Sequence, residues 1–116
     1  MVVNSAAEAP SMFSPPPIKG IGFDMLYMVI EQYKQGPGPV YQRASIHGRM
    51  LPSGLHYLGS WVVDDEKLET CFQLMETDDP ELLQVWRNRW EDLVAFEVKP
   101  VITSGEAAAR SRTVSP

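Results

Sequence analysis

The chain has 116 residues, a formal net charge of −5 and a single cysteine, Cys71. This length predicts one domain, and an acidic balance without a basic stripe argues against binding of nucleic acid or of an anionic membrane surface. One cysteine cannot form an internal disulfide, and the sequence shows neither an apolar run of membrane-spanning length nor a secretory signal. We therefore expect a cytoplasmic protein.

Both ends of the chain predict disordered tails. Residues 1–24 are rich in Ala, Ser, Pro and Gly, a composition that buries too little apolar surface to offset its ordering entropy. Residues 105–116 are interpreted in the same way. The folded domain is then expected at residues 25–104, and translation could start at Met1 or at Met25.

The first two elements are predicted to be a strand and a helix. Met25–Tyr33 alternates with period two, so Leu26, Met28 and Ile30 share one side of the strand. Tyr27, Val29 and Glu31 share the other side. After the Gly36-Pro37-Gly38 turn, a helix is expected from Pro39 to about Met50. Its apolar face is formed by Val40, Ala44, His47 and Leu51.

A hairpin follows. Two runs rich in β-branched and aromatic residues, Leu55–Val63 and Leu68–Met75, flank the acidic turn Asp64–Lys67. With that turn as the loop, the expected cross-strand pairs are Val63 with Leu68, Trp61 with Thr70, Gly59 with Phe72, and Tyr57 with Leu74.

A second helix and a last strand complete the domain. Asp79 is a good N-cap, and Pro80 suits the first helical position. The helix is expected to reach about Glu91. Its buried stripe comprises Leu82, Leu83, Trp86 and Trp90. The last strand is expected at Leu93–Thr103, where Pro100 favours a sheet edge.

The order β-α-β-β-α-β predicts an α+β, ferredoxin-like fold with sheet order 4-1-3-2 and both helices on one face. The predicted core beneath the helices is Leu26, Met28, Ile30, Tyr57, Trp61, Phe72, Leu74, Val94, Phe96 and Val98. The predicted helix-free face carries Tyr27, Val29, Glu31, His56, Leu58, Ser60, Cys71, Gln73, Met75, Ala95 and Glu97. That face is too apolar for open water, so we expect a second copy to pack on it as a homodimer.

Three stretches resemble a family of small bacterial domains of unknown function: GRMLPSGLHYLGSWV, CFQLMETDDPELLQVWRNRWEDLV and FEVKPVITS. That family is similar to the dimeric α/β-barrel superfamily, and the resemblance covers about residues 25–104. It implies the fold and a homodimer. The wider superfamily includes cofactor-independent monooxygenases, haem-binding enzymes, isomerases and binding domains, so the resemblance implies a cleft rather than one reaction.

The candidate site is predicted on the helix-free sheet face. His56 is the best candidate for a general acid or base, with Glu31 or Glu97 as its partner, because histidine titrates near neutrality. The candidate ligand-binding residues are Tyr27, Glu31, His56, Ser60, Gln73, Met75 and Glu97. The alternative is that these groups only form hydrogen bonds across the dimer interface.

No metal or cofactor is predicted. His47 and His56 are the only histidines and are not at ligand spacing, and one cysteine cannot build a zinc cluster. Haem ligation by His56 would rest on a lone histidine, which is weak evidence.

Three functions therefore stay open. The first is a homodimeric domain that binds a small, largely apolar molecule. The second is a cofactor-independent oxidoreductase or isomerase that acts on such a molecule. The third is a pure association module.

Overall fold

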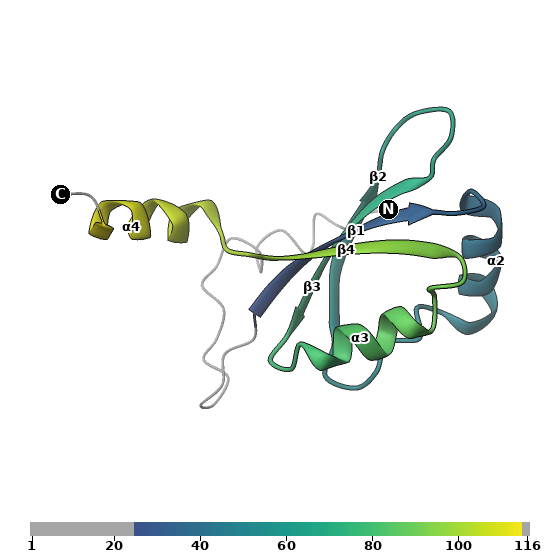
Figure 1. The fold of residues 1–116 in the computed structure, drawn as a ribbon, viewed down its shortest axis with the longest axis horizontal. Helices are drawn as coiled ribbons and strands as arrows, with labels where there is room; N and C mark the ends of the chain where they lie inside the picture. Colours follow the sequence, from purple (N-terminus) through teal and green to yellow (C-terminus); the bar gives the residue numbers. More distant parts are fainter. Residues whose placement is uncertain (1–24, 115–116) are drawn as a thin grey trace.

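A computed structural model describes residues 25–114, so the predicted tail at residues 1–24 lies outside the described part of the chain. The elements follow one another as shown in Figure 1: β1 (Met25–Tyr33), α2 (Pro37–His47), β2 (His56–Val62), β3 (Thr70–Thr77), α3 (Glu81–Asn88), β4 (Val94–Val101) and α4 (Ser104–Val114).

The four strands form one antiparallel sheet in the order β2-β3-β1-β4. Read from the other edge, this is the predicted order 4-1-3-2, and the α+β class is confirmed. Strand β4 lies at an edge of the sheet. Proline has no backbone N–H, and an edge strand tolerates this because it pairs on one side only. The bounds of β1 agree with the prediction residue for residue. The strand ends at Tyr33, just before the turn at Gly36, whose φ angle is 78°.

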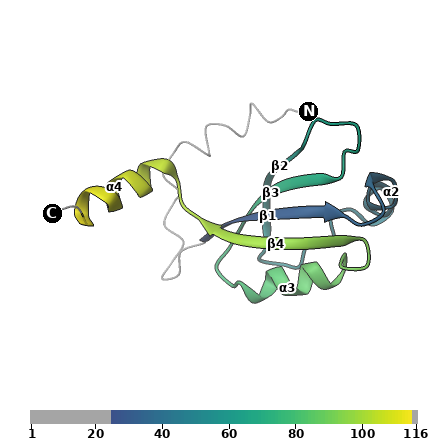
Figure 2. The same ribbon diagram turned by 45° about the horizontal axis from the view of Figure 1, so that its top comes forward.

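The face that the helices cover differs from the prediction. Tyr27, Val29 and Met75 are buried in one cluster with Trp86 and Trp90, which come from α3 and the turn after it. Figure 2 shows α3 along this face. The side of β1 that carries Leu26, Met28 and Ile30 is only partly buried, and none of the helices described by the structure covers it (Figure 2). Alternation identifies which residues share a side, but both sides of β1 are apolar, and the prediction assigned them to the wrong faces.

The register of the hairpin also differs. Trp61 pairs with Phe72 and Gly59 with Leu74, because the loop is longer than the predicted four-residue turn. In that loop, the Asp65 Oδ1 atom accepts the backbone N–H groups of Lys67 and Leu68, at 3.0 and 2.9 Å. A bulge between Tyr57 and Gly59 then places Tyr57 opposite Met75, on the helix-covered face.

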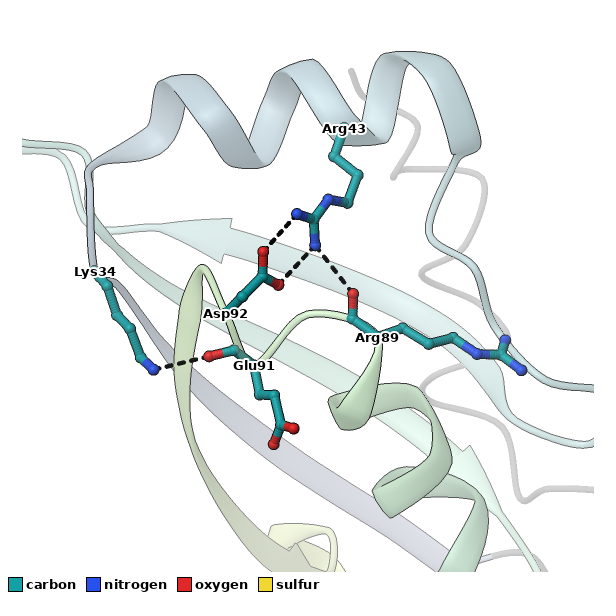
Figure 3. A network of polar contacts seen from close by, with 5 residues as sticks. All are labelled: Lys34, Arg43, Arg89, Glu91 and Asp92. Atoms are coloured by element: carbon teal, nitrogen blue, oxygen red, sulfur yellow. Dashed lines mark hydrogen bonds and ion pairs between the residues drawn. The ribbon is translucent and has the colours of Figure 1, made fainter.

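Helix α2 lies across the end of the sheet where β1 ends (Figure 1). Val40 is its buried residue, whereas His47 is exposed. Figure 3 shows how this helix is held. Arg43 binds Asp92 through two hydrogen bonds of 2.8 and 2.6 Å and donates a third, of 3.1 Å, to the carbonyl of Arg89. These contacts join α2 to the segment after α3.

The C-terminal segment is not the disordered tail that its composition predicted. Ser104–Val114 forms α4, which extends from the end of β4 away from the sheet (Figures 1 and 2). The Thr103 Oγ1 atom accepts the backbone N–H of Glu106 at 3.1 Å, which caps the first turn. Arg110 and Glu106 form an ion pair one turn apart, at 3.8 Å. Residues 104–112 of this helix are exposed, so local interactions rather than a packed face stabilise it.

Candidate functional site

A cavity of about 330 Å³ lies between α2, the turn after α3 and the covered face of the sheet. Most of its wall is apolar or aromatic, with Val40 and Ala44 from α2 and Trp86 and Trp90 from the opposite side. The polar part of its wall includes Glu31, Gln73, Arg49 and Ser60. An apolar cavity with a few converging polar groups is the usual form of a small-molecule site.

Glu31 is the buried acid of this cavity, with 4% of its surface exposed. It reaches the covered face because it lies at an inward position of β1, two residues after Val29. The Gln73 Nε2 atom donates a hydrogen bond to the Glu31 Oε2 atom, and the Arg49 Nη1 atom donates to the Gln73 Oε1 atom at 3.2 Å. Arg49 therefore fixes the orientation of the amide that binds Glu31.

Burial raises the pKa of Glu31 from 4.5 to about 7. The hydrogen bonds from Gln73 and Tyr33 and the positive charge of Arg49 oppose this rise. Burial also raises the pKa of the Cys71 thiol to about 11, so the thiol stays protonated and is a poor nucleophile at neutral pH. Glu31 is thus the group in this cavity that can exchange a proton near neutrality.

Hydrogen bonds to the backbone carbonyl of Arg49 and a sharp turn of the chain fix the position of this residue. Its carbonyl accepts the indole N–H groups of Trp86 and Trp90, each at 3.0 Å. The residues on either side, Gly48 and Met50, have φ angles of 68° and 57°, so the chain turns sharply here. The Arg49 side chain then lies over the ring of Tyr57, with Cζ 3.5 Å from the ring centroid.

The structure divides the predicted site residues into three groups. Glu31, Ser60 and Gln73 line the cavity, on the face opposite to the predicted one. Tyr27 and Met75 are buried in the core of that same face. His56 and Glu97 lie on the helix-free face.

The predicted pairing of His56 with Glu31 or Glu97 is wrong within one chain. His56 pairs with Glu76 in the ladder between β2 and β3, and Glu31 points to the other face. Glu97 is on β4, at the opposite edge of the sheet, which is about 14 Å away at the usual strand spacing. The prediction failed because it placed Glu31 on the helix-free face. It also derived the strand register of the hairpin without the bulge between Tyr57 and Gly59.

Arg49, Tyr33, Trp86 and Trp90 were not predicted as site residues. The two tryptophans were expected in the core, where they do lie, but their N–H groups also hold the Arg49 carbonyl. One signal was present in the sequence. Glu31 shares a side of its strand with Val29 and Tyr33, and a carboxyl in an apolar stripe needs a partner. The hydrogen-bond partner is Gln73 of β3, and Arg49, which orients Gln73, comes from a loop and follows no periodic pattern.

Within the described residues, no group of three His, Cys, Asp or Glu side chains is placed to hold a metal ion. None of the described helices combines the length and the apolar character needed to cross a membrane.

The sequence matches a family model described as Domain of unknown function (DUF3303) over residues 25–114. The chain belongs to this family. The match confirms the predicted membership in a family of unknown-function domains, and it includes α4, which the sequence resemblance left out. The bacterial origin and the barrel superfamily stay predictions. No curated protein matches the chain.

Proposed function

We propose that this domain binds a small molecule with an apolar body and a polar group in the cavity between α2, α3 and the sheet. The observation that carries the proposal is Glu31, a buried carboxyl on the cavity wall whose hydrogen-bond partner, Gln73, is itself oriented by Arg49. Burying a carboxyl lowers stability, and such groups are characteristic of functional sites. The proposed ligand site therefore moves from the helix-free face to the covered one.

A second candidate is an enzyme that transfers a proton without a cofactor, as an isomerase does. It is favoured by the pKa of about 7 at Glu31, which suits a general acid or base at neutral pH. In this version Glu31 takes the role that the sequence suggested for His56. Binding of a small molecule in the cavity is common to both candidates.

We also propose that the domain is a homodimer joined through the helix-free face, as in a dimeric α/β barrel. Leu26, Met28, Ile30 and Phe72 are only partly buried there, and Trp61 is 53% exposed. At the β4 edge of this face, Glu97 and Lys99 form an ion pair of 3.0 Å. A second copy packed on this face would cover these apolar residues and leave the Glu97–Lys99 ion pair intact.

The ligand proposal is tested with benzyl alcohol, phenol and indole as probes, followed by backbone amide shifts in nitrogen-15 spectra. We expect saturable shifts at Glu31, Gln73 and Ser60. Ala44→Phe fills the cavity from α2 and should abolish them. Gln42→Phe adds the same ring at an exposed site of α2 and should leave them unchanged. Shifts that persist in Ala44→Phe, or no saturable shift with any probe, would overturn the proposal.

A further inference from the structure

We propose that the ligand of this cavity is a small carboxylate, that Arg49 binds its carboxylate group at the entrance, and that Glu31 takes up a proton as it binds. This inference rests on the proposed function, since it names the chemistry of a ligand in the same cavity.

Arg49 has the geometry of a carboxylate-binding group. It lines the cavity but is exposed, whereas Glu31 is buried, so Arg49 marks the entrance and Glu31 the inner wall. Its guanidinium lies over the Tyr57 ring, and its Nη1 atom donates to Gln73. Among the described residues, Gln73 is the acceptor for this side chain. Because a guanidinium carries five N–H donors in a planar fork, further donors remain for a carboxylate.

The charge balance of the cavity links this carboxylate to Glu31. Arg49 and Glu31 are the charged side chains on the cavity wall. The other titratable groups there are Tyr33 of β1, Cys71 of β3 and Tyr41 of α2, and all three are neutral in their protonated forms. The remaining wall residues come from α2 and the residue after it, from β2, β3 and β4, and from the segment that carries Trp86 and Trp90, and none of them titrates.

An incoming carboxylate therefore meets one cation and one acid. If Glu31 is ionised, two negative charges share the single Arg49, which is linked to Glu31 through the amide of Gln73. If Glu31 is protonated, the carboxylate and Arg49 form a balanced pair. Like charges at a shared site raise the pKa of the weaker acid, so binding favours the protonated form of Glu31.

The result is an affinity that falls as the pH rises through the pKa of Glu31, about 7. If only the protonated form binds, the competent fraction falls from about nine-tenths at pH 6 to about one-tenth at pH 8. The dissociation constant for a carboxylate should then rise about ten-fold between these two pH values. A neutral probe should show no such change.

The experiment compares benzoate with benzyl alcohol, because the two probes share a ring and differ in charge. Titration calorimetry at about pH 6 and about pH 8 should give the ten-fold change for benzoate alone. Glu31→Gln should remove the pH dependence, and Arg49→Gln should weaken benzoate at least ten-fold at the lower pH, a larger loss than for benzyl alcohol. Lys99→Gln removes a positive charge from the helix-free face and should change the affinity for neither probe.

The outcomes separate the two proposals. If neither probe binds, the proposed function fails together with this inference. If benzyl alcohol binds but benzoate binds equally well at both pH values, or tolerates Arg49→Gln, only the carboxylate inference is overturned. Proton uptake on benzoate binding, measured as a buffer-dependent heat that disappears in Glu31→Gln, supports it directly.

Discussion

At the scale of single residues, Glu31 determines how the stability of the domain depends on pH. Its pKa of 4.5 in the unfolded chain rises to about 7 in the folded state, because the carboxyl is buried. The folded protein therefore keeps this proton to a higher pH than the unfolded chain does. The free energy of unfolding should fall as the pH rises from about 4.5 to about 7 and stay level above that range.

We predict that Glu31→Gln stabilises the protein at about pH 8 by up to about 3 kcal/mol, the value that this shift in pKa represents. The amide retains an acceptor for Gln73 but cannot ionise. At about pH 5 the variant and the wild type should agree to within about 1 kcal/mol, because the carboxyl of the wild type is then neutral. Urea unfolding at both pH values measures this difference.

Glu66→Gln, at an exposed position of the hairpin loop, is the matched control and should show no pH-dependent gain. A Glu31→Gln variant less stable than the wild type at both pH values would contradict this account of the carboxyl.

The sequence predicted part of this cluster. Period two placed Glu31 with Val29, and Cys71 with Gln73, on the correct shared sides of their strands. It could not show which face the helices cover, because Leu26, Met28 and Ile30 made the other side of β1 look equally suitable for a core. Besides Tyr33 of the same strand, the groups that offset the burial of Glu31 include Gln73 and Arg49, which are distant in the sequence, and alternation within one strand gives no sign of them.

At the scale of elements, the segment from α3 to Trp90 fixes the loop that carries Arg49. Two indole N–H groups share one acceptor, the Arg49 carbonyl, and Arg89 holds the next carbonyl, of Met50, at 2.7 Å. The start of this helix was predictable from Asp79, whose Oδ1 atom accepts the backbone N–H of Glu81 at 3.0 Å. The loop was not, because its positive φ angle at Met50 has no sequence signature comparable to glycine.

We predict non-additive losses from the two indoles. Trp86→Phe and Trp90→Phe should each cost about 1–3 kcal/mol, mainly from lost packing, because the other indole still satisfies the Arg49 carbonyl. The double variant should cost about 1 kcal/mol more than the sum, because that carbonyl then loses both donors. Urea unfolding of all four proteins gives the coupling energy. Strict additivity would show that the shared acceptor contributes nothing.

At the scale of the whole molecule, the helix-free face is an apolar surface that no described helix covers. The sequence predicted an apolar uncovered face and placed His56, Ala95 and Glu97 on it correctly, but it assigned the residues of β1 and β3 to the wrong faces. The structure places Phe72 and Trp61 there as a ladder pair, and the Trp61 ring lies over Gly59, within 3.3 Å of the position that a Cβ atom would take. A flat aromatic surface of this kind favours packing against a second sheet.

We predict that the protein has twice the chain mass in light scattering at micromolar concentration. Phe72→Glu should convert it to a monomer, because a charge at the centre of an apolar interface stays without a partner. Val85→Glu, at an exposed apolar site on α3, should remain a dimer. Nitrogen-15 spectra establish that each variant is folded. A wild-type protein with the mass of one chain would contradict the dimer and leave this face for another partner.

The most direct test of the central claim is the titration of the Glu31 side-chain carboxyl, followed by carbon-13 chemical shift and assigned by comparison with Glu31→Gln. The account predicts a midpoint near pH 7 in the free protein and a higher midpoint in the presence of benzoate. A midpoint near the ordinary value of 4.5 would mean that this carboxyl is not the buried acid of a ligand cavity, and it would contradict the account.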